Sequence, residues 1–268
     1  MRSRLCATGV LAIAVLSGWS LSWCASQRPS NRSTWGRILV IGDEQESQSG
    51  RDFAELYDPA TNQFAVRRPA MKNGRNGASA TVIPSGANAG KILLVGGWTD
   101  RTVKKDVSIP VSLASTELYD AATRSFAQPD MTATLKAARA FHTATVISSG
   151  PNAGGILIAG GQRDDENPLS STEIYDPATN SFKPGPAMDS PRSQHAAIVI
   201  ASGSNAGKIL IAGGMELGCY SFKRGCAPAL LSSTEIHDPT TNTFTPGPEM
   251  RAAPGQKPAI QLPQAPPR

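Results

Sequence analysis

The sequence has few of the residues that build metal and catalytic sites. Its 268 residues include three histidines and four cysteines, and Cys6 and Cys24 lie in an apolar N-terminal stretch. His142 and His195 share one position of a repeat described below, but a metal site needs three or four convergent ligands. No phosphate-binding glycine loop, dinucleotide-binding motif or Ser-His-Asp arrangement is recognisable. We therefore expect no metal ion and no other cofactor.

Charged and aromatic residues are also scarce, at 18% and 6% of the chain. Lysine and arginine form no cluster along one face, so the sequence predicts no nucleic-acid partner. The 25 glycines and 21 prolines recur at fixed places between short apolar runs. This regularity excludes a disordered chain and favours many short strands joined by tight turns.

The N-terminal stretch is set apart from the rest of the chain. A basic start (residues 1–4) precedes an uncharged, mostly apolar segment (residues 5–21), and polar sequence begins at Gln27. This is the order of regions in a secretory signal peptide. We expect removal of residues 1–26, which hold two arginines and no acidic residue, so that the net charge falls from +5 to +3. The mature protein is then secreted, periplasmic or displayed at the cell surface.

Two alternatives keep the protein at a membrane, which is otherwise not an expected partner. The apolar segment is long enough for a retained signal-anchor helix. Cys24 permits a lipoprotein interpretation, although the bulky Trp23 precedes it where such signals carry a small residue. After export only Cys219 and Cys226 remain, and a close pair in an oxidising compartment predicts a disulfide.

Internal repetition is the most informative feature of the sequence. A Glu-x-Tyr-Asp segment, with His in place of Tyr in the last copy, is followed by a Thr, a Phe and then a Met; its four copies begin at Glu55, Glu117, Glu173 and Glu235. An apolar run that ends in Gly-Gly, or in Gly-Asp before the first copy, precedes each of them, at residues 38–43, 92–97, 156–161 and 209–214. A third apolar run comes before the last three of these, at residues 80–83, 144–147 and 198–200.

These runs predict strands and turns. They are short, rich in β-branched residues and uncharged on both alternating faces, which indicates strands covered on both sides. Asp-Pro-Ala-Thr-Asn is turn chemistry, with Asn tolerating positive φ. Gly-Gly suits a crowded position, or one where φ must be positive. Each repeat thus holds four short strands, and such sheets need neighbours stacked on them, as in a propeller.

The pattern resembles the kelch repeat, in which a hydrophobic run ends in two glycines and is followed by a spaced Tyr and a Trp. Here Phe64, Phe126, Phe182 and Phe244 take the place of the Trp, His237 replaces the last Tyr, and Asp43 replaces one glycine. The resemblance implies an all-β fold, a β-propeller of about four four-stranded blades. We expect a signal peptide (1–26), a short linker (27–36), the propeller (37–262) and a Pro-rich tail (263–268).

Closure of the ring is left open by the sequence. Shifted by 62 positions, residues 194–200 match residues 256–262, which predicts a degenerate first strand at the C-terminus. That strand would pair with residues 37–41, which have no clear first strand of their own, and Pro258 suits a terminal strand. The alternative is an incomplete propeller that is open or needs another copy.

The spacing of the repeats places all large insertions on one face. From the Tyr position to the next Gly-Gly the distance is 38 to 41 residues, whereas from the Gly-Gly to the next Tyr position it is 15 in two repeats and 23 and 24 in the others. One face thus carries the long loops, and such a face is often the binding face. Its candidate contact residues are Trp98, Lys104, Lys105, Tyr220, Phe222 and Arg224. The alternative is that these loops are merely tolerated surface insertions.

Charged residues also recur with the repeat. Arg75, Arg139 and Arg192 precede the first strand, Pro254 breaks the series, and the four glutamates named above lie in the third strand. Opposite charges with one period predict structural ion pairs, and a ring of arginines that binds an acidic ligand is the alternative. The leading functional prediction is an exported, non-catalytic module that recognises a protein or a glycan through its long-loop face.

Two other functions stay open. Galactose oxidase and sialic acid epimerases share the kelch scaffold, so the resemblance also allows a secreted carbohydrate-active enzyme of the epimerase or oxidase type. No matching set of Tyr, Cys and His copper ligands is recognisable, although Arg and Glu offer acid–base groups. A partial propeller that serves only as a spacer is the third option.

Overall fold

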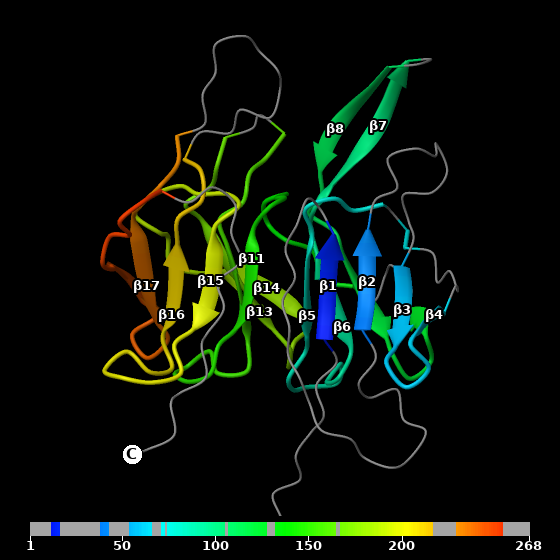
Figure 1. Cartoon of the computed structure of the whole chain (residues 1–268), viewed down its shortest axis with the longest axis horizontal. Helices are drawn as coiled ribbons and strands as arrows, with labels where there is room; N and C mark the ends of the chain where they lie inside the picture. Colours follow the sequence, from blue (N-terminus) through cyan, green and yellow to red (C-terminus); the bar gives the residue numbers. More distant parts are fainter. Residues whose placement is uncertain are drawn as a thin grey trace, which may run out of the picture.

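The chain folds into sheets alone over the residues that the structure describes. The computed structural model describes residues 12–16, 38–42, 54–65, 71–72, 74–104, 107–127, 132–164, 167–216 and 229–253. Within these ranges it holds eighteen strands and no helix. Four four-stranded sheets stand around a common axis, with a separate two-stranded sheet above them (Figure 1). The predicted all-β class and the four-stranded blades are confirmed.

Each four-stranded sheet is one blade, numbered in chain order. Blade 1 consists of β1 (Ala12–Leu16), β2 (Ile38–Gly42), β3 (Ala54–Asp58) and β4 (Gln63–Ala65). Blade 2 consists of β5 (Ser79–Val82), β6 (Ile92–Val95), β9 (Thr116–Asp120) and β10 (Ser125–Phe126). Blade 3 consists of β11 (Thr143–Val146), β12 (Ile156–Ala159), β13 (Thr172–Asp176) and β14 (Ser181–Pro184). Blade 4 consists of β15 (Ala196–Val199), β16 (Ile209–Ala212), β17 (Thr234–Asp238) and β18 (Thr243–Pro246).

The second strand of each inner blade is buried on both faces, as the uncharged runs predict. All four residues of β6 and of β12 are buried. Leu94 of β6 packs in a cluster with blade 1, whereas its neighbour Leu93 packs in a cluster with blade 3. Because successive side chains of a strand point to opposite faces, one short run joins the blade to both of its neighbours.

The turn between the third and fourth strands follows the predicted chemistry. In blade 3 the Asp176 carboxylate accepts a hydrogen bond from the Ala178 N–H at 2.9 Å, and Asn180 has a φ of 50°. The Tyr175 hydroxyl donates to Asn180 Oδ1, and its ring lies 5.3 Å from that of Phe182.

Blade 4 builds the same turn with a histidine in place of the tyrosine. His237 is buried, lies 5.1 Å from Phe244 and shares a hydrogen bond with Asn242. Burial lowers its pKa, and the Asn242 hydrogen bond opposes this. The substitution of Tyr by His therefore keeps both the ring contact and the polar contact.

The inner strand of blade 1 differs from the other three. β1 pairs with β2 in parallel, whereas β5, β11 and β15 are antiparallel to their partners. The sequence analysis assigned no strand to residues 12–16, which lie in the predicted signal peptide. The C-terminal strand expected at residues 256–262 lies outside the described residues. Among the described residues no helix is long and apolar enough to span a membrane.

Candidate functional site

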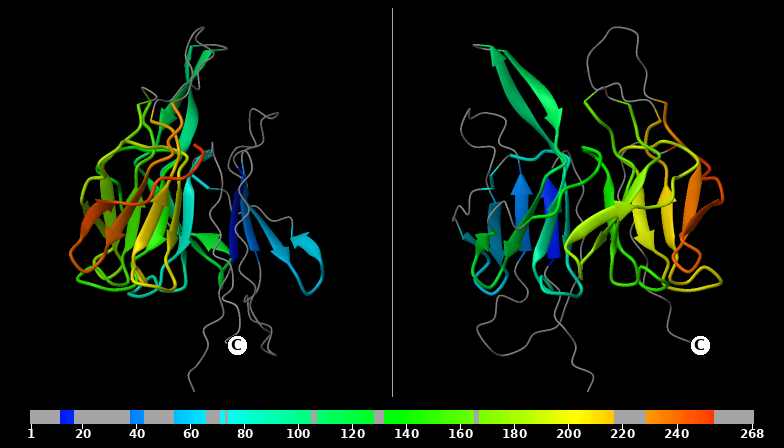
Figure 2. Two further views of the ribbon diagram at one scale, coloured as in Figure 1. Left: turned by 60° about the vertical axis from the view of Figure 1, so that its left-hand side comes forward. Right: turned by 180° about the vertical axis from the view of Figure 1, so that it is seen from behind.

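The longest described insertion on the long-loop face is an antiparallel hairpin. It consists of β7 (Trp98–Lys104) and β8 (Val107–Ser112), and it projects beyond the ends of the blade strands in every view (Figures 1 and 2). It connects the second and third strands of blade 2, where the repeat spacing predicted an insertion. The long insertion that the spacing predicts between these two strands is thus the hairpin β7–β8.

The hairpin is fixed at its base and exposed along its length. At the base, the backbones of Trp98 and Asn76 exchange hydrogen bonds of 2.8 and 2.9 Å, and the Ser112 N–H donates to the Asp164 carboxylate of the neighbouring blade. Further out, Val103 is 47% exposed and Ile109 is 39% exposed. The hairpin is thus held at its base by hydrogen bonds and exposes apolar side chains to solvent.

The other long loop is described only at its base. Met215 pairs with Leu230, and the Glu216 N–H donates to the Ala229 carbonyl at 2.9 Å. Lys104 lies exposed at the end of β7, and Trp98 is half-buried at its start. The remaining predicted contact and disulfide residues lie outside the described ranges: Lys105, Cys219, Tyr220, Phe222, Arg224 and Cys226. The disulfide stays a prediction.

A chain of backbone hydrogen bonds links the inner ends of three blades on the same side. The Phe141 N–H donates to the Gly77 carbonyl at 2.7 Å, and the Gln194 N–H donates to the Phe141 carbonyl at 2.9 Å. All three residues have left-handed φ values of 65°, 56° and 55°. For a bulky residue such as Phe141 this conformation is rare, and it persists only where the surroundings enforce it.

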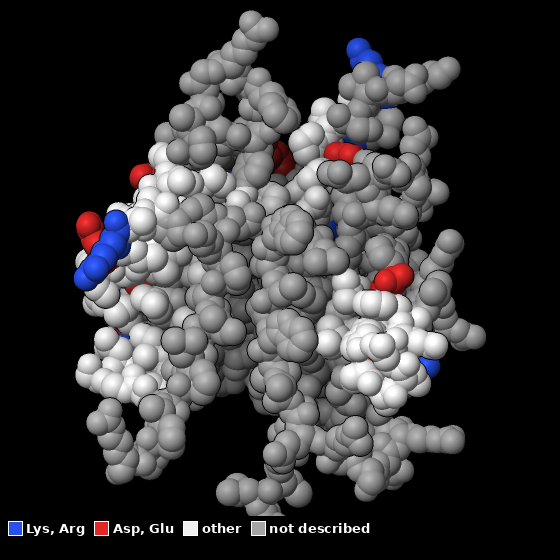
Figure 3. All heavy atoms as spheres, in the orientation of Figure 1, with Lys and Arg blue, Asp and Glu red and all other residues white. Residues whose placement is uncertain are grey.

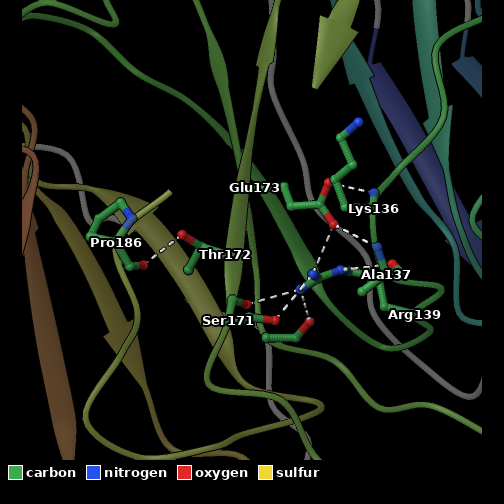
Figure 4. A network of polar contacts seen from close by, with 8 residues as sticks. Lys136, Ala137, Arg139, Ser171, Thr172, Glu173 and Pro186 are labelled. Carbon is green, nitrogen blue, oxygen red and sulfur yellow. Dashed lines mark hydrogen bonds and ion pairs between the residues drawn. The ribbon is translucent and has the colours of Figure 1, made fainter. Parts of the chain in front are cut away.

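The recurring arginines and glutamates form buried ion pairs within blades 2, 3 and 4, and Figure 4 shows the pair of blade 3. Arg139 donates from Nη2 to Glu173 at 3.1 Å and from Nη1 to the Gly160 and Ser171 carbonyls at 2.8 and 2.9 Å. The Glu173 carboxylate also accepts the Lys136 and Ala137 N–H groups. One carboxylate therefore holds both the guanidinium and the loop that leads into the inner strand.

The same network recurs in the neighbouring blades. Arg75 pairs with Glu117 at 2.9 Å, and Arg192 pairs with Glu235 at 2.8 Å. Burial lowers the pKa of Arg75 and Arg139, while the paired glutamate charge opposes this shift. The three arginines of the repeat are thus engaged with protein partners. The structural interpretation requires this arrangement, and a ligand-binding ring of arginines does not.

The diglycine segments of blades 2 and 3 contact the backbone at the repeat arginine of the next blade, Arg139 and Arg192 respectively. Gly96 and Gly97 have φ values of 58° and 92°. A Cβ on Gly96 would clash with the Arg139 carbonyl oxygen and come within 3.0 Å of the His142 ring. The Gly97 N–H donates to that same carbonyl at 2.9 Å. Both predicted reasons for the glycines, crowding and positive φ, apply at once.

Comparison with known proteins agrees with this architecture. A family model of the kelch motif matches residues 152–189, which span most of blade 3. A solved structure of YjhT aligns with a TM-score of 0.55 and 11% identity, covering 76% of this chain. The chain has the fold of a kelch-type β-propeller, and residues 152–189 carry a kelch motif.

This chain spans 64% of the length of the YjhT chain, and at 11% identity the likeness shows the fold alone. In all, 166 chains of solved structures match. No curated protein sequence matches.

Serine and threonine residues of the kelch network were missed in the sequence analysis. Ser115, Ser171 and Ser233 each accept a guanidinium hydrogen bond, and the following threonines each donate to a backbone carbonyl further along the chain. The sequence pattern that could have revealed them is a Ser-Thr-Glu triplet, which is present in three repeats. The first repeat has Phe53, Ala54 and Glu55 at these positions instead. Within the described residues, Glu55 has no arginine partner.

On the face drawn in Figure 3, the basic and acidic side chains of the described residues are few and scattered. Among the described residues, no group of three or more His, Cys, Asp and Glu side chains converges as a metal site would require.

The two repeat-position histidines are buried between blades. His142 Nε2 shares a hydrogen bond with Ser79 at 2.8 Å, and His195 Nε2 shares one with Thr143 at 2.9 Å. Burial and the nearby arginine charges lower the pKa of each to about 3. Both histidines are therefore neutral at physiological pH and act as blade-to-blade hydrogen-bonding groups.

These depressed pKa values predict acid sensitivity. In the unfolded chain the histidines titrate near 6.5, so below that pH the unfolded state binds more protons. The free energy of unfolding then falls toward pH 3 by about 1.4 kcal/mol per pH unit for each histidine. We expect the double variant His142→Gln/His195→Gln to lose about 2–3 kcal/mol less than the parent between pH 6 and pH 5. Urea unfolding at both pH values measures this, and equal losses would contradict it.

Proposed function

We propose that this kelch propeller is an exported binding module that holds a protein or a glycan on its long-loop face. The hairpin β7–β8 is the observation that carries the proposal. It is a two-stranded sheet outside the blades, and an isolated two-stranded sheet is only marginally stable in water. An element of this kind gains stability when a ligand covers it.

The edges and faces of the hairpin favour a protein over a glycan. Both strands are edge strands of a two-stranded sheet, and an extended segment of a partner can add to a strand edge. The cross-strand pair Arg101 and Ile109 lies on one face, and the next pair, Asp100 and Pro110, lies on the other. Arg101 and Ile109 are both exposed, and an arginine beside an apolar side chain is common at interface hot spots.

Two matched variants test this assignment. We expect Arg101→Ser/Ile109→Ser to weaken the affinity of a captured ligand at least tenfold, or about 1.4 kcal/mol. Asp100→Ser/Pro110→Ser changes the adjacent pair on the opposite face and should leave the affinity within about twofold. The measurement is affinity capture from a lysate and on a glycan panel, followed by titration of each captured ligand.

The outcomes separate the possibilities. Loss of a protein ligand in the first variant alone supports the proposal. Unchanged binding after replacement of residues 99–111 by a short turn would refute it. A ligand found only on the glycan panel and insensitive to the hairpin would place recognition elsewhere. The enzyme alternative drew on the recurring arginines and glutamates, and in blades 2 to 4 these are paired with each other.

A further inference from the structure

The two faces of the hairpin β7–β8 carry different side chains. In an antiparallel pair, directly opposed residues lie on the same face, and successive residues alternate between the faces. Two opposed pairs share one face: Thr99 with Val111, and Arg101 with Ile109. Asp100 and its partner Pro110 lie on the other face. The first face therefore combines a basic side chain with apolar ones, and the acidic side chain points the opposite way.

A bulge in β7 adds a second basic residue to the first face. Arg101 and Lys104 are three residues apart, and on a regular strand such residues lie on opposite faces. The register shifts between Thr102 and Lys104, so that Lys104 pairs with residue 107, two positions from Ile109. Because residues two apart on β8 share a face, Lys104 lies on the face of Arg101. Bulges re-aim side chains in this way.

This face, here called the basic face, is accessible to a partner. Its members are Thr99, Arg101, Lys104, Ile109 and Val111. Arg101 and Lys104 are both exposed, and Ile109 is 39% exposed. The hairpin stands beyond the blade strands in both views of Figure 2. Two cations on one exposed face favour a partner that carries negative charge and disfavour a basic one.

The two edges of the hairpin are not equivalent. The Trp98 N–H and carbonyl both bond to Asn76, so these groups point away from β8. Because outward-pointing residues alternate along an antiparallel pair, Pro110 and Ser112 have their backbone groups on the outer edge of β8. Pro110 has no N–H, and the Ser112 N–H donates to Asp164. The outer edge of β8 therefore offers no backbone donor at these two positions, which is typical of a protected edge.

Strand addition is thus directed to β7. The backbone of residue 102 belongs to the outward-pointing set of β7, because it lies an even number of positions from Trp98 and precedes the bulge. A strand added there places side chains about 4.5–5.5 Å from Arg101 and Lys104 on the basic face. Opposite charges at this distance are favourable, and like charges are unfavourable. Because the bulge gives the two cations the separation of alternate residues, the matching charges of the partner are two residues apart.

We propose that the partner is an extended protein segment that pairs with β7 and places two acidic side chains, two residues apart, beside Arg101 and Lys104. The inference rests on the proposed function, because it takes the hairpin as the binding element. It adds the charge of the partner, the spacing of that charge and the strand that the partner joins. An anionic lipid surface would meet the same cations, but it forms no backbone ladder along β7 and has no strand spacing to match.

The test compares two short peptides of one composition, made of threonine, valine and two glutamates. In the first peptide the glutamates are two residues apart. In the second they are three apart, so that they lie on opposite faces of an extended chain. We expect the first to bind the full chain about fivefold tighter or more, measured by the fluorescence anisotropy of the labelled peptides. Equal affinities would overturn the proposal.

Deletion of Val103 is a variant that keeps both cations and moves them apart. Without the bulge, Arg101 and Lys104 lie on opposite faces, so the preference should pass to the second peptide. Arg101→Glu/Lys104→Glu should lose the first peptide and bind a matched peptide with lysines in place of the glutamates. Arg124→Glu/Lys183→Glu changes the net charge equally at two exposed positions of the blades, and it should leave the affinities within about twofold. An equal loss in this control would show that only net charge matters.

Methylation of the peptide backbone tests the pairing itself. Alternate N–H groups of an added strand point toward β7, and the others point away. The first peptide, N-methylated at every second residue in one register, should lose binding, and in the other register it should keep binding. Equal effects of the two registers would contradict a strand that pairs with β7.

Two further measurements separate this inference from the proposed function. If replacement of residues 99–111 by a short turn releases a captured protein while the two peptides bind the parent equally, the hairpin is the binding element and the acidic strand is wrong. If the replacement leaves the captured protein bound, the proposed function fails as well. Vesicles of phosphatidylserine and phosphatidylcholine in equal parts form the last arm. Vesicle binding that Arg101→Glu/Lys104→Glu abolishes, without any peptide preference, would assign the basic face to a membrane and refute the proposal.

Discussion

Arg139→Ala is expected to lower the free energy of unfolding by about 3–5 kcal/mol. Arg139 is fully buried and donates to one carboxylate and two carbonyl oxygens. Its removal leaves Glu173 charged in a site that has lost its counter-charge. The remaining backbone N–H donors stabilise that carboxylate only in part. Breaking one side of a buried pair is more destabilising than deleting both partners.

Urea unfolding and calorimetry of the parent and variants measure this effect. Lys208→Met is the control, because Lys208 forms a 3.1 Å pair with Asp238 in which both side chains are partly exposed. Exposed pairs contribute about 0–1 kcal/mol, so the control should lower the melting temperature by no more than about 4 °C. Arg139→Lys keeps the charge and loses the forked donors, and we expect an intermediate loss. Equal shifts for Arg139→Ala and Lys208→Met would contradict a buried structural pair.

The blades were predictable because each depends on local pattern and on repetition. The turn at Asp176 and Asn180 needs only nearby residues, and its φ value and hydrogen bonds agree with the prediction. The pairing of Arg139 with Glu173 follows from a shared period once the blade is known. In the same way, the burial of β6 and β12 follows from runs that carry no charge on either face.

The remaining features depend on contacts that no local pattern encodes. The hairpin β7–β8 was expected only as a long loop, since it belongs to no repeated block and its register shifts between Thr102 and Lys104. The Ser112–Asp164 hydrogen bond joins insertions of two different blades, 52 residues apart in the chain. The parallel strand β1 was missed because an apolar run in a signal-like segment carries no sign of its partner.

The candidate site was also predictable only in part. The face was predictable, because insertion length is visible in the repeat spacing, and the hairpin rises from that face. The side chains that we propose as ligand contacts were not, because Arg101 and Ile109 come together only through the register of the hairpin. The sequence named Trp98 and Lys104 instead, and the structure places the first at the base of the hairpin and the second at its end.

Gly96→Ala is expected to destabilise the protein by roughly 2–5 kcal/mol. A left-handed conformation at a residue with a Cβ costs about 1–2 kcal/mol, and Gly96 has a φ of 58°. The added Cβ also meets the Arg139 carbonyl oxygen, and overpacking of this kind costs typically about 1–3 kcal/mol. Because that oxygen accepts the Gly97 N–H, any shift that relieves the clash weakens the contact between blades 2 and 3.

Gly90→Ala separates the two contributions. Gly90 has a φ of 80° and lies in the same blade, but a Cβ there would meet nothing within 4 Å. It should show the conformational term alone, about 1–2 kcal/mol, whereas Gly96→Ala should show both. Chemical denaturation of the two variants gives the difference directly. If Gly90→Ala were as destabilising as Gly96→Ala, the diglycine segment would be required for its backbone conformation only. The close approach of blades 2 and 3 would then not contribute to the loss of stability.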